Sequence, residues 1–462
     1  MQQNNDFLAT EPVGRLLRRL SIPTIVAQVI NMLYNIVDRI YIGHIPGDGA
    51  LALTGVGVCL PIIMVVSAFA SLVGSGGAPR ASIAMGRGDT KTAQRILNNC
   101  FVLQIAISVV LTAVLLIFNR RFLLAFGASE NTIGYAAGYM GVYALGTVFV
   151  QLTLGMNSFI TAQGFTSVAM RTVLIGAVCN IVLDPVFIFA LGMGVEGAAL
   201  ATILSQAVSC IWVILFLSGR KTVLKISPGD MSPDLKILGS CLSLGLASFI
   251  MSASESVISV CFNSSLLKYG GDLAVGAMTI LTSVMQFALM PLQGLGQGAQ
   301  PIISYNYGAG NSDRVRRTYR LLLTADLAYS LLLWLITMLF PRQFAGIFTS
   351  DPALLDFTRH ALRIYTAVLF LFGIQMACQT TFVAIGCAGS SIIVAVMRKF
   401  VLLLPLIYIM PAIFADKTSA VYAAEPAADA LAITFTSILF FFRFRKAMRG
   451  IEDTSGIRED AT

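Results

Sequence analysis

The chain has 462 residues and a formal net charge of +8; 56% of its residues are hydrophobic and only 12% are charged. Soluble domains carry roughly 25% charged residues, so the composition excludes a soluble globular protein and indicates a membrane protein. A basic excess is typical of membrane topology and of contact with anionic lipid, and we expect no binding of nucleic acid.

Apolar stretches long enough to cross a bilayer recur along the chain. A spanning helix needs about 20 mostly apolar residues, and these stretches predict an all-α integral membrane fold with twelve transmembrane helices. Most of the 31 Lys and Arg residues lie in alternate connections, among which we count Arg398 and Lys399. Because cytoplasmic loops hold the excess of Lys and Arg, both termini are expected in the cytoplasm. The helices are centred near residues 30, 64, 106, 145, 180, 207, 250, 286, 328, 370, 404 and 433.

An internal repeat organises the chain, since Pro79 and Pro301 lie 222 positions apart and many other residues match at the same offset. Six helices per copy is an even number, so both copies enter the membrane from the same side, as in transporters built from parallel repeats. We expect two pseudo-symmetric six-helix bundles: an N-terminal lobe over 1–218 and a C-terminal lobe with a basic cytoplasmic tail over 237–462. A cytoplasmic linker over 219–236 joins them. Further matched pairs are Gly76 and Gly298, Gly86 and Gly308, Arg95 and Arg317, and Gly164 and Gly386.

The first predicted helix carries polar residues on one face. Asn31, Asn35 and Asp38 follow at helical spacing, and Tyr34 lies beside them. A carboxylate at the bilayer centre costs roughly 2.5–3.5 kcal/mol, so this face should turn toward the bundle interior. Alternatively, Asp38 is wetted at the helix end beside Arg39.

The fifth predicted helix places an amide and a carboxylate on one face, because Asn180 and Asp184 are four residues apart. Pro185 follows directly and removes a backbone hydrogen bond, which predicts a kink. Pro23 is the corresponding hinge of the first helix. Oxygen-bearing side chains beside a freed carbonyl suit a small cation or a proton-binding carboxylate. A purely structural kink is the alternative.

The second half carries different polar groups. Glu255 follows a stripe of serines, and its repeat partner is Leu33, so the acids of the two halves are not symmetry mates. Asp429 falls near the middle of the last helix and either lines the cavity or bonds neighbouring helices. Asp326 is expected at the cytoplasmic surface. Glu255 is expected to meet a cationic substrate or a coupling ion, and a hydrogen-bonded structural role is the alternative. The remaining candidates for lining a substrate cavity are Met285, Gln286 and Gln379, for which ordinary helix packing is the alternative.

Short motifs recur in a fixed order: Gly76-Gly77-Ala78-Pro79, Asn180-Ile181-Val182-Leu183-Asp184-Pro185, Gly197-Ala198-Ala199-Leu200-Ala201-Thr202, Gln297-Gly298-Ala299-Gln300-Pro301, Gly308-Ala309-Gly310-Asn311 and Pro426-Ala427-Ala428-Asp429. Together with Pro23 and Asp38, this set resembles the multidrug and toxic compound extrusion (MATE) family over about residues 10–446. Within the family, the chain looks most similar to the bacterial branch of MepA-like exporters.

The resemblance implies an antiporter that exports amphipathic, cationic compounds in exchange for H⁺ or Na⁺ by alternating access, with no other cofactor. Several branches pair the acid matched by Glu255 with an aspartate in helix ten, but residues 361–382 contain no carboxylate. The coupling ion is therefore expected in the N-terminal lobe, where Na⁺ would be the only metal. The implied ion site is Asp38, Asn180, Asp184 and Thr202, supported by the polar side chains of Asn31, Tyr34, Asn35 and Tyr139.

The expected setting is a bacterial cytoplasmic (inner) membrane, with small amphipathic drugs and membrane lipid as partners and a monomer as the working unit. Only two histidines are present, which gives no support to an enzyme with a Ser-His-Asp or metal constellation. A flippase for a lipid-linked saccharide precursor is the alternative transporter. Such a protein needs basic residues at mid-membrane to receive a pyrophosphate, whereas this chain has internal acids and its basic residues fall mostly at helix ends. Arg398 and Lys399 of the eleventh helix come closest to an exception.

Overall fold

The structure is a computed structural model that describes residues 7–227, 231–346 and 351–459, with side chains described up to Glu452. Within these ranges the chain is built from helices and contains no β-strand.

The first half of the chain forms six membrane spans, one of which is a helix pair bent by 58° at Gly146. The elements are a short α1 (Phe7–Thr10), α2 (Val13–Gly43), α3 (Gly49–Gly86), α4 (Thr90–Ala125), the bent pair α5 (Ile133–Leu145) and α6 (Thr147–Ala162), α7 (Thr166–Pro185) with the π-helix η1 (Val186–Ala190), and α8 (Gly194–Ser218).

The second half repeats this plan. α9 (Leu235–Gly308) consists of two helices in direct succession, because Gly271 has φ 65° and ψ −163°, far from helical values. A bend of 45° separates α12 from the helical turn that leads into α13. The other elements are α10 (Ser312–Leu339), α11 (Pro341–Gly346), α12 (Pro352–Tyr365), η3 (Leu369–Leu371), α13 (Phe372–Ala384), α14 (Ala388–Val396), the π-helix η4 (Met397–Leu403), α15 (Leu404–Ile413) and α16 (Lys417–Glu459).

Twelve spans result. In the described chain, nine helices are long and apolar enough to cross a membrane, and the two bent pairs raise this to eleven. Counting α9 as two helices divided at Gly271 gives twelve. The predicted all-α fold of two six-helix bundles is confirmed.

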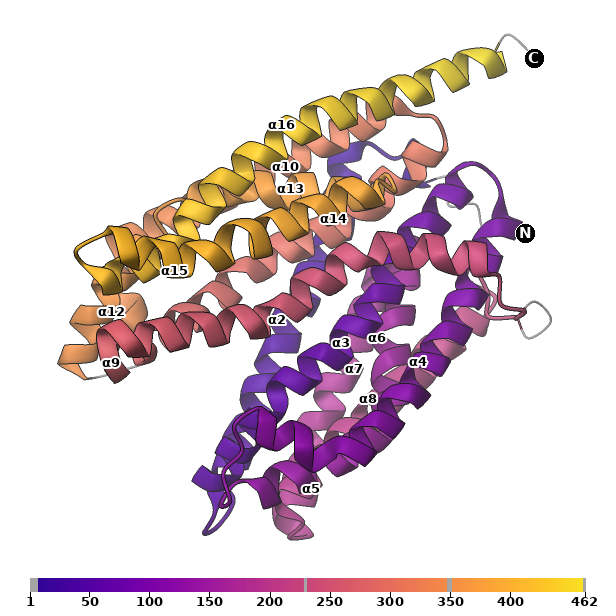
Figure 1. Ribbon diagram of the computed structural model, residues 1–462. Helices are drawn as coiled ribbons and strands as arrows, with labels where there is room; N and C mark the ends of the chain where they lie inside the picture. The colour runs from indigo at the N-terminus through magenta and orange to yellow at the C-terminus, as the bar shows by residue number, and fades with distance from the viewer. Residues whose placement is uncertain (1–6, 228–230, 347–350, 460–462) are drawn as a thin grey trace.

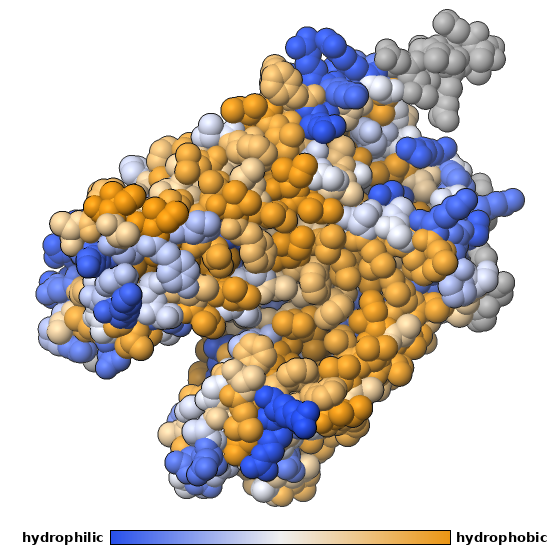
Figure 2. All heavy atoms as spheres, in the orientation of Figure 1, coloured by the Kyte–Doolittle hydropathy of each residue, from blue (hydrophilic) through white to orange (hydrophobic). Residues whose placement is uncertain are grey.

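The two bundles meet at one end and diverge toward the other, which gives the molecule the shape of a V (Figure 1). Figure 2 shows a hollow between the two arms. Hydrophilic residues gather at the tips of the arms and at the joined end, and apolar residues cover most of the surface between them (Figure 2). This distribution is that of a protein whose arms are immersed in a bilayer.

Reciprocal glycine contacts join the bundles. A Cβ added to Gly86 of α3 would lie 2.9 Å from the carbonyl carbon of Tyr305 in α9. A Cβ added to Gly308 would lie 2.8 Å from the carbonyl carbon of Ile83. Gly86 and Gly308 are 222 positions apart, and so are Ile83 and Tyr305. The two contacts are therefore equivalent under the pseudo-symmetry of the repeat. Glycine is needed at both positions because only a bare backbone permits this approach.

Arg398 and Lys399 are not in a connection, which corrects the sequence-based assignment. Both lie within η4, in the middle of the span built from α14, η4 and α15, and both are buried. Two adjacent basic residues between apolar segments predict a loop, because charged residues are rare inside a spanning helix. They are tolerated there only where partners neutralise them.

We predict that Gly308→Val destabilises the protein by about 1–3 kcal/mol, because the added side chain must displace the α3 backbone. The loss would be measured as a lower thermal midpoint of the purified protein in detergent. Gly239→Val is the matched control, since Gly239 also lies in α9 but has open space around its Cβ position. Equal midpoints for the two variants would contradict the close-packing explanation.

Candidate functional site

Two carboxyl groups face each other inside the N-terminal bundle. Asp38 of α2 and Asp184 of α7 lie within hydrogen-bonding reach of one another. Asp184 is fully buried, and Asp38 is half-buried. Oδ1 of Asp38 and Oδ2 of Asp184 are both closed off from solvent and accept no hydrogen bond from any described residue. Two carboxylates in such a position repel each other unless a proton or a cation lies between them.

Asn180 and Thr202 complete this cluster. Asn180 lies one turn before Asp184 and donates its Nδ2 hydrogens to Asp184 Oδ1 at 3.1 Å and to Thr202 Oγ1 of α8 at 3.5 Å. The side-chain oxygen of Asn180 is buried and has no donor among the described residues. Asp38, Asp184 and Asn180 therefore each have a side-chain oxygen that is free to bind an ion. Oxygen ligands of this kind suit a small hard cation.

Two tyrosines border the cluster. Tyr139 of α5 is buried, with its hydroxyl within hydrogen-bonding reach of Thr202. Tyr34 lies close enough to Asp38 to interact with its charge, and its hydroxyl reaches Asn35. The side chain of Asn35 donates to the backbone carbonyl of Asn31 at 2.5 Å, a bond within α2. The polar face of α2 thus leads up to the carboxyl pair.

The two prolines occupy different settings. α7 ends at Pro185 and the chain continues as the π-helix η1, so the regular hydrogen-bond ladder changes directly after Asp184. π-helical turns are frequent at functional sites. Pro23 lies inside α2, which is uninterrupted, and its neighbour Thr24 donates to the carbonyl of Gly294 in α9 at 2.6 Å. Pro23 therefore lies within the contact between α2 and the opposite bundle, between Ser21, which packs against Gly298, and Ile25, which packs against Gly294.

A buried ion-pair network occupies the C-terminal bundle. Arg398 donates to Asp429 at 2.7 Å and to Glu425 at 3.1 Å, both of α16, and its guanidinium lies 4.9 Å from the ring centre of Phe372. Lys399 donates to Glu255 of α9 at 2.7 Å. Three carboxylates thus face two bases. No pattern in the sequence indicates this pairing, because the partners are distant along the chain.

Glu255 is the accessible member of this network. Its side chain is 57% exposed, whereas that of Lys399 is only 4% exposed. By helical periodicity Glu255 lies on the flank of the α9 face that carries Gly245 and Phe249. These two residues contact Leu72 and the ring of Phe69 in the opposite bundle. Glu255 therefore lies further along α9 than the residues through which the bundles touch, and its side chain is free to contact solvent.

The other cavity candidates of the second bundle lie in three environments. Met285 packs on an apolar cluster that contains Leu292 and Phe372. Gln379 is buried and donates to the hydroxyl of Ser391 at 2.8 Å. Gln286 is exposed. Among the described residues, none of these three forms a hydrogen bond or an ion pair with Glu255.

The expectation that Asp326 reaches the cytoplasmic surface, based on its sequence position near Arg320, is wrong. Asp326 is 1% exposed, and neither carboxyl oxygen has a donor among the described residues. The backbone of Asp326 packs against Gly373 of α13, which has no side chain to keep the two helices apart. The close contact between α10 and α13 buries the Asp326 side chain. A larger distance between these two helices would leave that side chain solvated.

The chain is similar to a known family over most of its length. The family profile named MatE matches residues 23–186 and 247–409, one segment in each bundle. The Multidrug export protein MepA of Staphylococcus aureus (strain N315) is 23% identical over 453 residues, which is 98% of both chains. MepA of Staphylococcus haemolyticus (strain JCSC1435) is also 23% identical, over 88% of this chain and 89% of its own.

Solved structures share the fold. One described as the outward-facing conformation of a multidrug resistance MATE family transporter of the MOP superfamily superimposes with a TM-score of 0.90. It is 25% identical and covers 96% of this chain and 98% of its own.

We predict that Arg398→Met destabilises the protein by about 3–5 kcal/mol, because it leaves Glu425 and Asp429 buried without their cation. The effect would be read as a lower thermal midpoint in detergent. Lys399→Met is the matched control and should cost less, since its partner Glu255 is exposed and stays solvated. A larger loss for the Lys399 variant would be inconsistent with this ranking.

Proposed function

Because the chain belongs to the MatE family, we propose that it is a multidrug efflux antiporter that exports amphipathic, cationic compounds in exchange for H⁺ or Na⁺. The observation that carries the proposal is the close pair Asp38 and Asp184, in which Oδ1 of Asp38 and Oδ2 of Asp184 are buried and lack any donor among the described residues. The names of the curated relatives, multidrug export proteins, support the class of cargo.

The acid pair suits reversible uptake of one positive charge. A proton shared by the two carboxyls, or a Na⁺ held by them with Asn180, removes their mutual repulsion. Loss of the ion restores the repulsion and favours a rearrangement of α2 relative to α7. Since α2 also contacts α9 through Thr24 and Gly294, movement at the ion site is coupled to the junction of the bundles. We propose Pro23 and Pro185 as the points at which these helices yield.

The V shape supports alternating access. With the hollow open at one end and the glycine contacts closed at the other, a cargo could leave only through the open end. The open end is the exterior side if the Arg-rich joined end faces the cytoplasm, as the positive-inside rule favours. We propose this orientation, with both termini in the cytoplasm of a bacterium and the monomer as the working unit.

The partly exposed Glu255 and the excess of one acid in its network suit a positively charged cargo. A flippase for a lipid-linked saccharide precursor would need free bases in the cavity. The two buried bases of the C-terminal bundle are instead neutralised by Glu255, Glu425 and Asp429. This pairing does not favour the flippase.

We predict that Asp38→Asn and Asp184→Asn each abolish export, because an amide keeps the shape of the side chain but cannot bind or release a proton. The measurement is the resistance of expressing cells to a cationic dye or antiseptic, normalised to the amount of protein in the membrane. Asp272→Asn, which changes an exposed acid at the break in α9, should leave export intact. Normal resistance with both site variants would rule out this ion site.

We predict that one ion gradient alone suffices. Proteoliposomes that receive either a pH gradient or a Na⁺ gradient would report transport of a fluorescent cation. One of the two gradients should drive transport, and Asp184→Asn should remove that response because the ion loses its carboxylate. Equal stimulation of the wild type and the Asp184 variant would contradict coupling at this cluster.

A further inference from the structure

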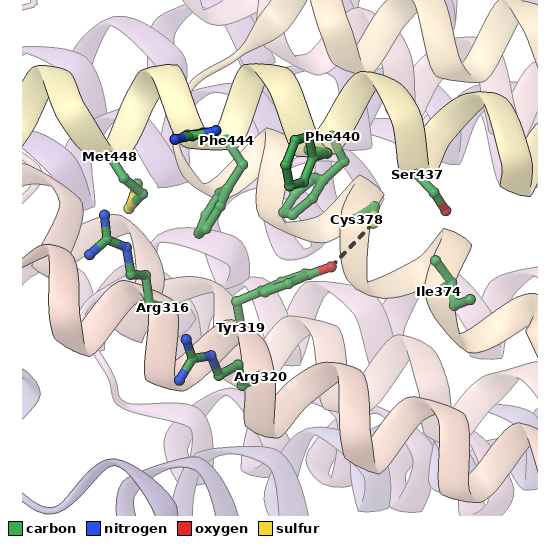
Figure 3. A pocket seen from close by; sticks show the side chains of 11 residues that line it. Arg316, Tyr319, Arg320, Ile374, Cys378, Ser437, Phe440, Phe444 and Met448 are labelled. Atoms are coloured by element: carbon green, nitrogen blue, oxygen red, sulfur yellow. Dashed lines mark hydrogen bonds between the residues drawn. The ribbon is translucent and has the colours of Figure 1, made fainter.

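A groove of about 380 Å³ opens on the C-terminal bundle away from the ion site, at the joined, Arg-rich end of the molecule. α10, α13 and α16 form its walls (Figure 3). Its floor is aromatic: the ring of Tyr319 lies 4.6 Å from that of Phe440 and 5.3 Å from that of Phe444. The Tyr319 hydroxyl and the Cys378 thiol share a hydrogen bond of 3.6 Å. The volume lies in the range of ordinary small-molecule sites.

Three arginines line the same groove. Arg316 is paired with Glu452 at 2.8 Å. Arg320 and Arg445 are exposed and have no carboxylate partner among the described side chains. Figure 3 shows Arg316 and Arg320 side by side on α10, below the row of apolar side chains from α16. The groove thus combines an apolar channel with cationic groups that have no counter-charge within the described protein.

The N-terminal bundle has an equivalent groove, and a segment of the chain after α8 fills it. The offset of 222 relates Tyr319, Ile374 and Cys378 to Leu97, Leu152 and Met156, which pack in one cluster with the fully buried Leu224. Leu224 belongs to the segment that follows α8. In the described part of the C-terminal bundle no such segment turns back, because α16 continues as a helix to Glu459.

The polar residues of the two grooves differ accordingly. Arg316 and Arg320 correspond to Gln94 and Asn98 under the same offset. Gln94 accepts from the backbone N–H of Lys225 at 2.8 Å, and Asn98 accepts from that of Ser227 at 3.2 Å. The N-terminal groove therefore has amides that hold a peptide segment, whereas the C-terminal groove has arginines, which suit a phosphate.

We propose that the C-terminal groove binds an anionic glycerophospholipid, with an acyl chain along Phe440 and Phe444 and the phosphate at Arg320 and Arg445. Basic pockets between spanning helices are the form of site that anionic headgroups occupy. The lipid takes the place that the segment around Leu224 fills in the other bundle. This proposal is independent of the ion site and of the direction of transport.

Native mass spectrometry of the full chain in detergent tests the proposal, with phosphatidylglycerol, phosphatidylcholine and inorganic phosphate as probes. The wild type should bind phosphatidylglycerol about tenfold more tightly than phosphatidylcholine, and Arg320→Gln with Arg445→Gln should remove that preference. Ser437→Trp, which narrows the apolar part of the groove, should weaken phosphatidylglycerol binding with every charge intact. Arg220→Gln with Lys221→Gln is the matched control, because both residues are exposed and follow the filled groove.

Four results would overturn the proposal. Unchanged phosphatidylglycerol binding by the Arg320 and Arg445 variant would remove the site. An equal loss in the Arg220 and Lys221 control would mean that only the overall charge matters. Displacement of the lipid by inorganic phosphate, or undiminished binding after Ser437→Trp, would mean that the acyl chain has no place in the groove and that the site takes a free anion.

Discussion

Carboxylates that lie close together inside an apolar bundle repel one another unless a positive partner is present, and this requirement separates the two acid clusters of the protein. In the C-terminal bundle Arg398 and Lys399 supply that partner, so Glu425 and Asp429 are neutralised within the fold. In the N-terminal bundle Oδ1 of Asp38 and Oδ2 of Asp184 are buried and have no donor among the described residues. The exchangeable ion that we propose would supply the positive partner there from outside the protein.

Duplication supplies the frame in which this difference operates. The reciprocal contacts of Gly86 and Gly308 bring the bundles together with bare backbones. At the glycines themselves no side chains interlock, although Leu16 and Leu20 of α2 pack in one buried cluster with Ile302 and Ile303 of α9 and would have to part from them as well. The same property that permits a close approach therefore suits a junction that opens and closes.

Equivalent positions in the two copies of the repeat carry residues of different chemistry. Leu224 and its neighbours fill a groove in one bundle, whereas the matching groove in the other is lined by arginines. The ion site and the ion-pair network differ in the same manner, since Leu33 stands where Glu255 has its repeat partner. A shared backbone plan thus carries chemistry that is specific to each half.

The sequence alone determined the apolar spans, the 222-residue repeat and the polar faces of the first and fifth helices, because each depends on local composition or on regular spacing. It also grouped Asp184 with Asn180, since residues four apart share a helix face. Only the tertiary structure decided that Arg398 and Lys399 are buried and neutralise Asp429 and Glu255, and that Asp326 is buried against Gly373. These outcomes depend on how closely helices distant in the chain approach one another, and no periodicity within a single helix encodes that distance.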